Sequence, residues 1–192
     1  MSLALYRLVT TLATPLIRRY VAGRVTRGRE DPTRVQERYG EPSQPRPDGR
    51  LIWIHGASVG ESLSVLSLID RLRAADPTLT ILMTTGTVTS ARLLAERAPA
   101  GVIHQYIPID RLAWVRRFLD HWRPDAALWV ESEFWPNLLN SIGDRNIPAI
   151  LINARISANS FRQWRRARWI IKRVLKNFDL CLAQTETDAD RL

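Results

Sequence analysis

Short apolar runs alternate with longer segments of helical periodicity from residue 51 to residue 192. The runs are four or five residues long and apolar almost throughout, which is typical of strands buried on both faces. They predict strands over residues 51–54, 79–83, 103–107, 126–130, 149–152 and 179–183. The intervals predict helices over residues 60–74, 87–97, 110–122, 135–144 and 161–177. This order predicts right-handed βαβ crossovers, and therefore an α/β fold with a doubly wound, mostly parallel sheet.

The first 22 residues have the pattern of an amphipathic helix. Its apolar residues recur at helical spacing, and its polar residues lie on another face: Leu5, Leu8, Val9, Leu12 and Leu16 against Arg7, Thr11, Thr14 and Arg18. The run is too short to cross a bilayer, which takes about 20 apolar residues. We expect residues 1–22 to form an interfacial helix in the headgroup layer, with a kink near Pro15. A helix packed on the domain and a cleaved secretory signal are the alternatives.

The next segment, residues 23–50, is rich in Pro, Gly and Arg, which is typical of an irregular connection. Within it the pattern predicts one short helix over residues 33–38. The chain therefore divides into a membrane-associating helix (1–22), a connecting segment (23–50) and an α/β domain (51–192).

The formal net charge is +9 and lies in the flanks: +5 for residues 1–50, −1 for residues 51–153 and +5 for residues 154–192. Such a basic chain favours a phosphate-rich partner, which is a nucleic acid, an anionic lipid or a phosphorylated substrate. The neutral middle argues against a sheet that reads a polynucleotide with its face. The single cysteine, Cys181, excludes a disulfide framework, and with three scattered histidines we expect no structural zinc site.

Between Arg162 and Lys176 the chain carries seven basic residues and no acidic one. On a helical projection six of these side chains share one face with Trp169: Arg162, Arg165, Arg166, Lys172, Arg173 and Lys176. We expect the opposite, apolar face to pack on the sheet. The basic face predicts contact with anionic headgroups, because each Lys or Arg near such a surface contributes about 1 kcal/mol. A solvated surface is the alternative.

Small and polar residues follow five of the predicted strands, at the carboxyl edge where open α/β sheets bind ligands. The segments are residues 55–61, 84–87, 108–110, 131–137 and 153–157. The first contains Gly56-Ala57-Ser58-Val59-Gly60, which has the spacing of the Gly-x-Ser-x-Gly elbow of serine hydrolases but not that of a dinucleotide or phosphate loop. The later histidines, His104 and His121, are badly placed for a triad. A tight strand-to-helix turn, with Glu61 stabilising the helix N-terminus, is the structural alternative.

Together these motifs resemble the N-terminal half of the 3-deoxy-D-manno-octulosonic acid (Kdo) transferases of lipopolysaccharide biosynthesis. The motifs, in this order, are His55 to Glu61, Thr84-Thr85-Gly86, Tyr106-Ile107-Pro108-Ile109-Asp110, Glu131-Ser132-Glu133-Phe134-Trp135-Pro136-Asn137-Leu138 and Asn153-Ala154-Arg155-Ile156-Ser157. The resemblance covers nearly the whole chain. It implies a GT-B glycosyltransferase, in which a Rossmann-like N-terminal domain receives the acceptor and a C-terminal domain, missing here, binds the donor CMP-Kdo.

The resemblance also implies the partners and the cellular location. The acceptor is the lipid A precursor (lipid IVA), the location is the cytoplasmic face of the bacterial inner membrane, and neither a cofactor, a metal nor a nucleic acid is expected. With the donor half missing, we expect the isolated chain to be inactive. The alternative function is a basic nucleic-acid-binding module, or a membrane-docking module without catalysis. Salt-dependent binding to anionic vesicles, without binding to RNA or DNA, would favour the Kdo transferase over the nucleic-acid-binding module.

By resemblance Glu61 is the catalytic base, a role that contributes about 10²–10⁴-fold to rate. Acceptor-binding or supporting roles fall to Ser58, Gly60, Thr85, Gly86, Glu131, Glu133, Asn153 and Arg155. We expect Glu131 and Glu133 to lie near Glu61, because the first and fourth strands of doubly wound sheets are commonly neighbours. One of the pair is alternatively a helix cap. The basic face around Arg162 and Lys172 is also expected to reach the acceptor phosphates.

Overall fold

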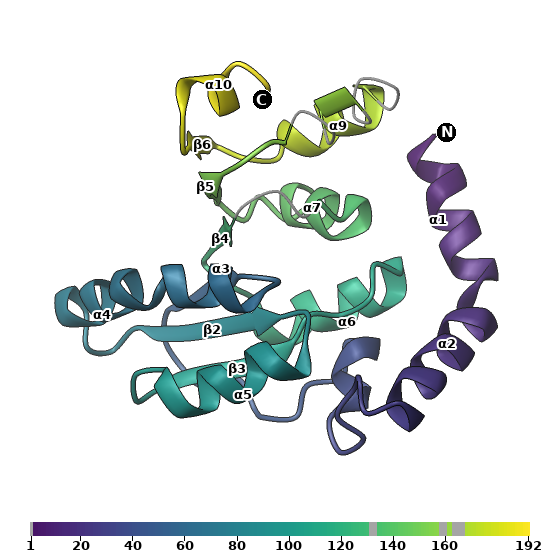
Figure 1. The fold of residues 1–192 in the computed structure, drawn as a ribbon, viewed down its shortest axis with the longest axis horizontal. Helices are drawn as coiled ribbons and strands as arrows, with labels where there is room; N and C mark the ends of the chain where they lie inside the picture. The colour runs from purple at the N-terminus through teal and green to yellow at the C-terminus, as the bar shows by residue number, and fades with distance from the viewer. Residues whose placement is uncertain (1, 131–133, 158–160, 163–167) are drawn as a thin grey trace.

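The computed structural model describes residues 2–130, 134–157, 161–162 and 168–192. Its centre is a six-stranded parallel sheet in the order β3-β2-β1-β4-β5-β6 (Figure 1). The strands are β1 Leu51–His55, β2 Thr80–Thr85, β3 Val102–Tyr106, β4 Ala126–Val130, β5 Ala149–Ala154 and β6 Leu180–Ala183. The strand order reverses between β1 and β4, so the topological switch point lies there. The predicted doubly wound sheet is confirmed.

Helices cover both faces of the sheet (Figure 1). The bounds are α3 Val59–Ser64, α4 Leu66–Ala75, α5 Val88–Arg97, α6 Leu112–Trp122, α7 Pro136–Gly143, α9 Arg168–Leu175 and α10 Glu186–Ala189. Successive residues of β1 belong to the two cores: Trp53 packs in one cluster with Phe118 of α6, its ring centroid 5.0 Å away. Ile54 packs in the other with Ile69 of α4 and Leu94 of α5. The strands are apolar throughout because each is buried from both sides.

The predicted strands agree with the observed ones to within two residues at each end. The single helix expected over residues 60–74 is wrong, because α3 ends and α4 begins around Val65. Near this break the Ser64 hydroxyl donates to the carbonyl of Glu61 (2.8 Å), a bond that competes with the helical ladder. The short helix expected over residues 33–38 is a 3₁₀ helix, η1 Val35–Tyr39. Of the basic helix expected over residues 161–177, residues 163–167 lie outside the described part.

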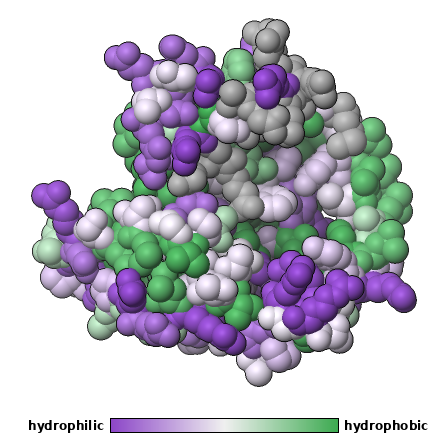
Figure 2. All heavy atoms as spheres, viewed as in Figure 1, coloured by the Kyte–Doolittle hydropathy of each residue, from purple (hydrophilic) through white to green (hydrophobic). Residues whose placement is uncertain are grey.

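The N-terminal segment forms two helices, α1 Leu3–Leu12 and α2 Thr14–Thr26, which meet at Ala13 and run along one side of the domain (Figure 1). The Tyr6 hydroxyl ties α1 to Asp110 Oδ2 (2.9 Å), and Arg111 Nε donates to Thr14 Oγ1 (2.7 Å). Large apolar side chains on the outer side stay exposed; we call this set the exposed stripe, and it comprises Leu5, Leu8, Val9, Leu12, Leu16 and Tyr20. Figure 2 shows hydrophobic residues along this margin, at the right of the view. Among the described residues, no helix has the length and apolarity to span a bilayer.

Candidate active site

The turn after β1 places Ser58 and Glu61 at the carboxyl edge, at the start of α3. Ser58 is the N-cap: its Oγ accepts a hydrogen bond from the Glu61 backbone N–H (3.3 Å), and its hydroxyl donates to Glu61 Oε1 (2.8 Å). Glu61 Oε2 accepts from the Ala57 backbone N–H (2.7 Å). This is a reciprocal cap of the capping-box kind. Glu61 therefore stabilises the helix start, and the same bonds hold its half-buried carboxylate in one orientation.

Of the two glycines in this turn, only Gly56 is closely packed. A Cβ at Gly56 would lie 3.2 Å from both Met83 Cε and the Ser62 nitrogen, so a side chain there would require these neighbours to shift slightly. A Cβ at Gly60 would meet nothing within 4 Å. The steric explanation of this motif therefore holds for its first glycine and leaves Gly60 unexplained.

The turn after β2 lies against the Glu61 turn. The Gly86 N–H donates to the carbonyl of Ala57 (3.2 Å), which is the residue whose own N–H holds the Glu61 carboxylate. Thr85 is fully buried, and its hydroxyl is bonded to His104 Nε2 (2.9 Å). Gly86 is thus placed at the edge, whereas Thr85 supports the edge from inside the domain.

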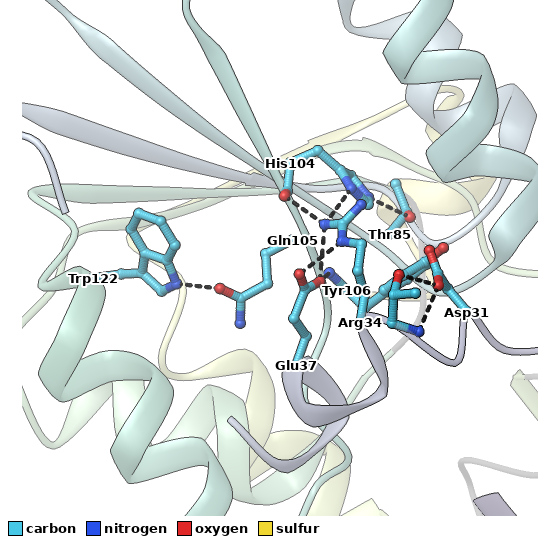
Figure 3. Close-up of polar contacts among 9 residues, drawn as sticks. Asp31, Arg34, Glu37, Thr85, His104, Gln105, Tyr106 and Trp122 are labelled. Carbon is cyan, nitrogen blue, oxygen red and sulfur yellow. Dashed lines mark hydrogen bonds and ion pairs between the residues drawn. The ribbon is translucent and has the colours of Figure 1, made fainter. Parts of the chain in front are cut away.

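The connecting segment holds β3 through an ion pair and hydrogen bonds (Figure 3). Arg34 pairs with Glu37 (2.8 Å) and donates to the carbonyl of His104 (2.8 Å). The Glu37 carboxylate is buried and accepts from the Tyr106 backbone N–H (2.7 Å). These contacts fix η1 along the strand that ends beside the Gly86 turn.

Arg38 of the same 3₁₀ helix reaches the carboxyl edge itself. Its guanidinium is buried, pairs with Glu30 (2.9 Å), and donates to the carbonyls of Gly86 (2.6 Å) and Ile107 (3.2 Å). Arg24 of α2 pairs with the other oxygen of Glu30 (2.7 Å). The ends of β2 and β3 are therefore tied through Arg38 to the N-terminal helices.

His104 is neutral in this network, and its tautomer follows from its partners. The Arg34 guanidinium can only donate, so His104 Nδ1 (3.0 Å away) is the acceptor and Nε2 carries the proton given to Thr85. Burial, together with the charges of Arg34 and Arg38, lowers the pKa of His104 to about 3. A proton on this imidazole would face two guanidinium groups.

The free energy of unfolding is expected to fall on acidification through His104. In the unfolded chain a histidine has a pKa near 6.5, whereas His104 in the folded protein has a pKa of about 3. Between these two pH values the unfolded state binds a proton that the folded state does not bind, so acidification favours unfolding. The cost at pH 5 is about 2 kcal/mol relative to pH 7. Urea unfolding of the protein and of His104→Gln at both pH values measures it. An equal pH dependence in the two proteins would contradict the assignment.

Asn153 and Arg155 lie at the carboxyl end of β5. β5 runs on to Ala154, so Asn153 lies within the strand and not after it, at a register irregularity where its φ is +55°. Its Oδ1 accepts from Gln184 Nε2 (2.8 Å), and Arg155 is exposed. Because β4 separates β5 from β1, these two residues lie at the same edge as Glu61 but two strands away.

Several expected site residues lie outside the described part: Glu131, Glu133, Arg165 and Arg166. Their predicted places beside Glu61 and on the basic face stay predictions. Of the described basic residues, Arg162, Lys172 and Arg173 are exposed, and Arg173 Nε donates to Asn140 Oδ1 (3.1 Å) of α7. On the apolar face of α9, Val174 is buried as predicted.

The hydrolase alternative gains no support from the geometry. The Ser58 hydroxyl donates to Glu61 rather than to a histidine, and the His104 ring is bonded to Thr85 and Arg34. The adjacent Glu61 is held as a cap, so this serine is not activated in the manner of a triad. Within the described ranges, no group of His, Cys, Asp and Glu side chains is arranged to hold a metal ion.

Sequence reasoning missed two buried residues that build the edge, Arg38 and Asp110. Asp110 accepts from the backbone N–H groups of Asn137 (2.9 Å) and Leu138 (2.8 Å), so it caps α7 from another element. Burial raises the pKa of its carboxyl, while these bonds lower it. Asp110 was expected to open α6, which instead begins at Leu112. The sequence placed Asp110 at the carboxyl edge, within residues 108–110, but gave no sign that it would cap α7.

The six-stranded parallel sheet, with its topological switch point between β1 and β4, defines the fold class of this protein. Solved structures with the same arrangement include a UDP-N-acetylglucosamine 2-epimerase (TM-score 0.53, 13% identity, covering 77% of this chain and 43% of that one). MurG from Acinetobacter baumannii is a second (TM-score 0.51, 11% identity, 73% and 42% covered). These likenesses show the fold alone. The chain is a Rossmann-like α/β domain of the GT-B type.

The sequence then specifies the family. The profile described as 3-deoxy-D-manno-octulosonic-acid transferase (kdotransferase) matches residues 33–192. A probable mitochondrial 3-deoxy-D-manno-octulosonic acid transferase of Arabidopsis thaliana is 42% identical over 83% of this chain and 36% of that protein. The transferase of Rickettsia bellii is 34% identical over 97% of the chain and 44% of that protein, and that of Haemophilus influenzae is 34% identical over 82% and 37%. The chain belongs to the Kdo transferase family, as its N-terminal domain, and spans less than half the length of these relatives.

Proposed function

We propose that this domain is the acceptor half of an enzyme that transfers Kdo from CMP-Kdo to the lipid A precursor, with Glu61 as the base. The observation that carries the proposal is the Glu61 carboxylate, oriented by Ser58 and Ala57 at the carboxyl edge in a member of the Kdo transferase family. Open α/β sheets bind their ligands at this edge.

The chemistry asks for one proton acceptor. A hydroxyl oxygen of the acceptor sugar bonds to the ketosidic carbon of Kdo, the bond from that carbon to the phosphate oxygen breaks, and cytidine monophosphate leaves. The hydroxyl proton passes to Glu61. A carboxylate has about four lone-pair positions, so the two bonds from Ser58 and Ala57 leave room for a substrate hydroxyl.

A division of labour between two domains is part of the proposal. This domain carries the acceptor site, and a second domain supplies the cytidine and phosphate contacts of the donor. The purified chain is therefore expected to bind vesicles that contain lipid A precursor in a saturable manner, to show no binding of CMP-Kdo by calorimetry, and to form no product alone. Transfer of Kdo by residues 1–192 without a second chain would overturn the division.

The exposed stripe supports contact with a membrane surface, which in this proposal is the cytoplasmic face of the inner membrane. Leu12 and Leu16 are each 71% exposed, although apolar side chains of this size are normally buried. The basic residues of α2 and α9 would meet anionic headgroups. An interfacial helix with these features binds without crossing the bilayer.

Replacing the two most exposed leucines tests this contact. Leu12→Ser and Leu16→Ser each lower the affinity for anionic vesicles by about tenfold, since each removes apolar area that the lipid would cover. Leu180→Ser is the matched control, because Leu180 is also an exposed leucine (48%) but lies on β6. Vesicle co-sedimentation measures the effect. The membrane role would be contradicted if Leu180→Ser lost as much vesicle affinity as the other two variants. It would also be contradicted if the protein bound RNA and did not bind vesicles.

A further inference from the structure

A cavity of about 190 Å³ opens between α2, the connecting segment and the turns after β2 and β3. Tyr20 and Arg24 of α2 line one side, Arg38 and Gly86 line another, and Trp135 completes it. Its volume is below the roughly 300–1,000 Å³ of sites that enclose a drug-sized ligand. The cavity therefore suits a single sugar or phosphate group, not a whole glycolipid.

The charged side chains in the lining of the cavity are Arg24, Arg38 and Glu30, so the lining carries a net positive charge. Within the lining, Glu30 lies between Arg24 and Arg38 and offsets only one of the two positive charges. The Arg38 side chain is 6% exposed and donates to Glu30 and to two backbone carbonyls. Arg24 donates to Glu30 and to the carbonyl of Arg29 (3.2 Å), but its side chain is 25% exposed. Arg24 is the cation that an anion in the cavity would meet.

The lining also holds an unused donor. The indole N–H of Trp135 is buried and has no hydrogen-bond partner among the described residues. Buried polar groups without a partner are rare, because each one loses its bonds to water on folding. An oxygen atom of a ligand in the cavity would supply the missing acceptor, with a small movement of the ring.

The position of the cavity selects the kind of ligand. Tyr20, at the end of the exposed stripe, lines its outer side. Gly86 lines its inner side and is one hydrogen bond from Ala57, which holds the Glu61 carboxylate. A lipid whose acyl chains rest against the stripe would place its headgroup between the membrane and the base.

The geometry points to a subsite in this cavity for the phosphorylated sugar headgroup of a membrane lipid, with Arg24 binding the phosphate and Trp135 Nε1 donating to a headgroup oxygen. This inference rests on the proposed function and adds to it the place and chemistry of acceptor recognition. The subsite binds its ligand without the donor, so the 192-residue chain is sufficient to test it.

The test compares two vesicle compositions of equal charge. One contains phosphatidylcholine and a phosphorylated glucosamine-disaccharide lipid, and the other contains phosphatidylcholine and phosphatidylglycerol. Arg24→Gln and Trp135→Phe each weaken binding to the first by about tenfold, which is the loss expected for one hydrogen bond to a charged group. Neither weakens binding to the second more than Arg92→Gln, which removes an exposed arginine from α5. Trp135→Phe keeps an aromatic ring at this position and leaves the Arg24–Glu30 pair in place, so it carries the test if Arg24→Gln is unstable.

Each outcome is decisive. Equal losses on both vesicles would mean general charge attraction and would overturn the subsite, as would unchanged binding of both variants. The soluble deacylated headgroup should compete with the glycolipid vesicles, and failure to compete assigns the binding to the acyl chains instead. Intact subsite binding together with unimpaired transfer by Glu61→Gln would refute the proposed base while leaving the subsite standing.

Discussion

Glu61→Gln lowers kcat for Kdo transfer by about 10²–10⁴-fold in an active enzyme that carries this domain with its donor half. The amide has the shape of the carboxylate and still accepts the bond from the Ala57 N–H, so the turn after β1 stays in place. What it loses is the ability to take up the hydroxyl proton. Because the proton moves only as the new bond forms, the KM for both substrates changes little.

The cap that surrounds Glu61 makes a control necessary. Ser58→Ala removes the hydroxyl that donates to Glu61 Oε1 and caps α3, yet it leaves the carboxylate in the site. Loss of an N-cap costs about 1 kcal/mol of stability, and loss of one orienting bond is expected to lower kcat by less than about tenfold. Steady-state kinetics of the two variants separates the roles. Normal kcat for Glu61→Gln, or equal losses in both, would remove Glu61 from the position of base.

The sheet was predictable because its signal is local. A strand buried on both faces must be apolar throughout, and residues 51–54 or 126–130 satisfy this without reference to the rest of the chain. The break at Val65 was not visible, since Leu63, Leu66 and Ile69 continue an apolar pattern across it. The position of Glu61 at the carboxyl edge followed from the rule that ligand sites lie at strand ends, and the alternative that Glu61 stabilises the helix start is confirmed by its two cap bonds.

The supporting residues of the site were not predictable, because their partners are distant in the sequence. Arg38 bonds to Gly86 and Ile107, and Asp110 bonds to Asn137; no spacing rule connects such pairs. A segment rich in Pro, Gly and Arg therefore reads as a linker although Arg38 is buried in it. Periodicity reports which face of an element is covered, but not which element covers it.

Among Gly28, Gly40 and Gly49, three glycines with positive φ, we expect replacement by alanine to cause the largest loss of stability at Gly40. Gly40 ends η1 in the left-handed region, with φ at +73°, and a Cβ built there would overlap the carbonyl oxygen of Trp114 in α6. Backbone strain costs about 1–3 kcal/mol and overpacking costs about 1–3 kcal/mol more, so the free energy of unfolding should fall by about 4 kcal/mol. That is a large share of the about 5–15 kcal/mol of a typical domain.

Two other glycines separate the clash from the strain. Gly28 and Gly49 also have positive φ, +66° and +87°, but a Cβ at either would meet nothing within 4 Å. Their alanine variants should lose only the about 1–2 kcal/mol of a left-handed residue, as measured by urea unfolding. The difference reports how tightly η1 is pressed on α6, which sets the place of Arg38 two residues earlier and, through Gly86, of the turn that holds Glu61. If Gly40→Ala were no less stable than Gly28→Ala, η1 would be free to shift, and the connecting segment could not be what fixes the edge of the site.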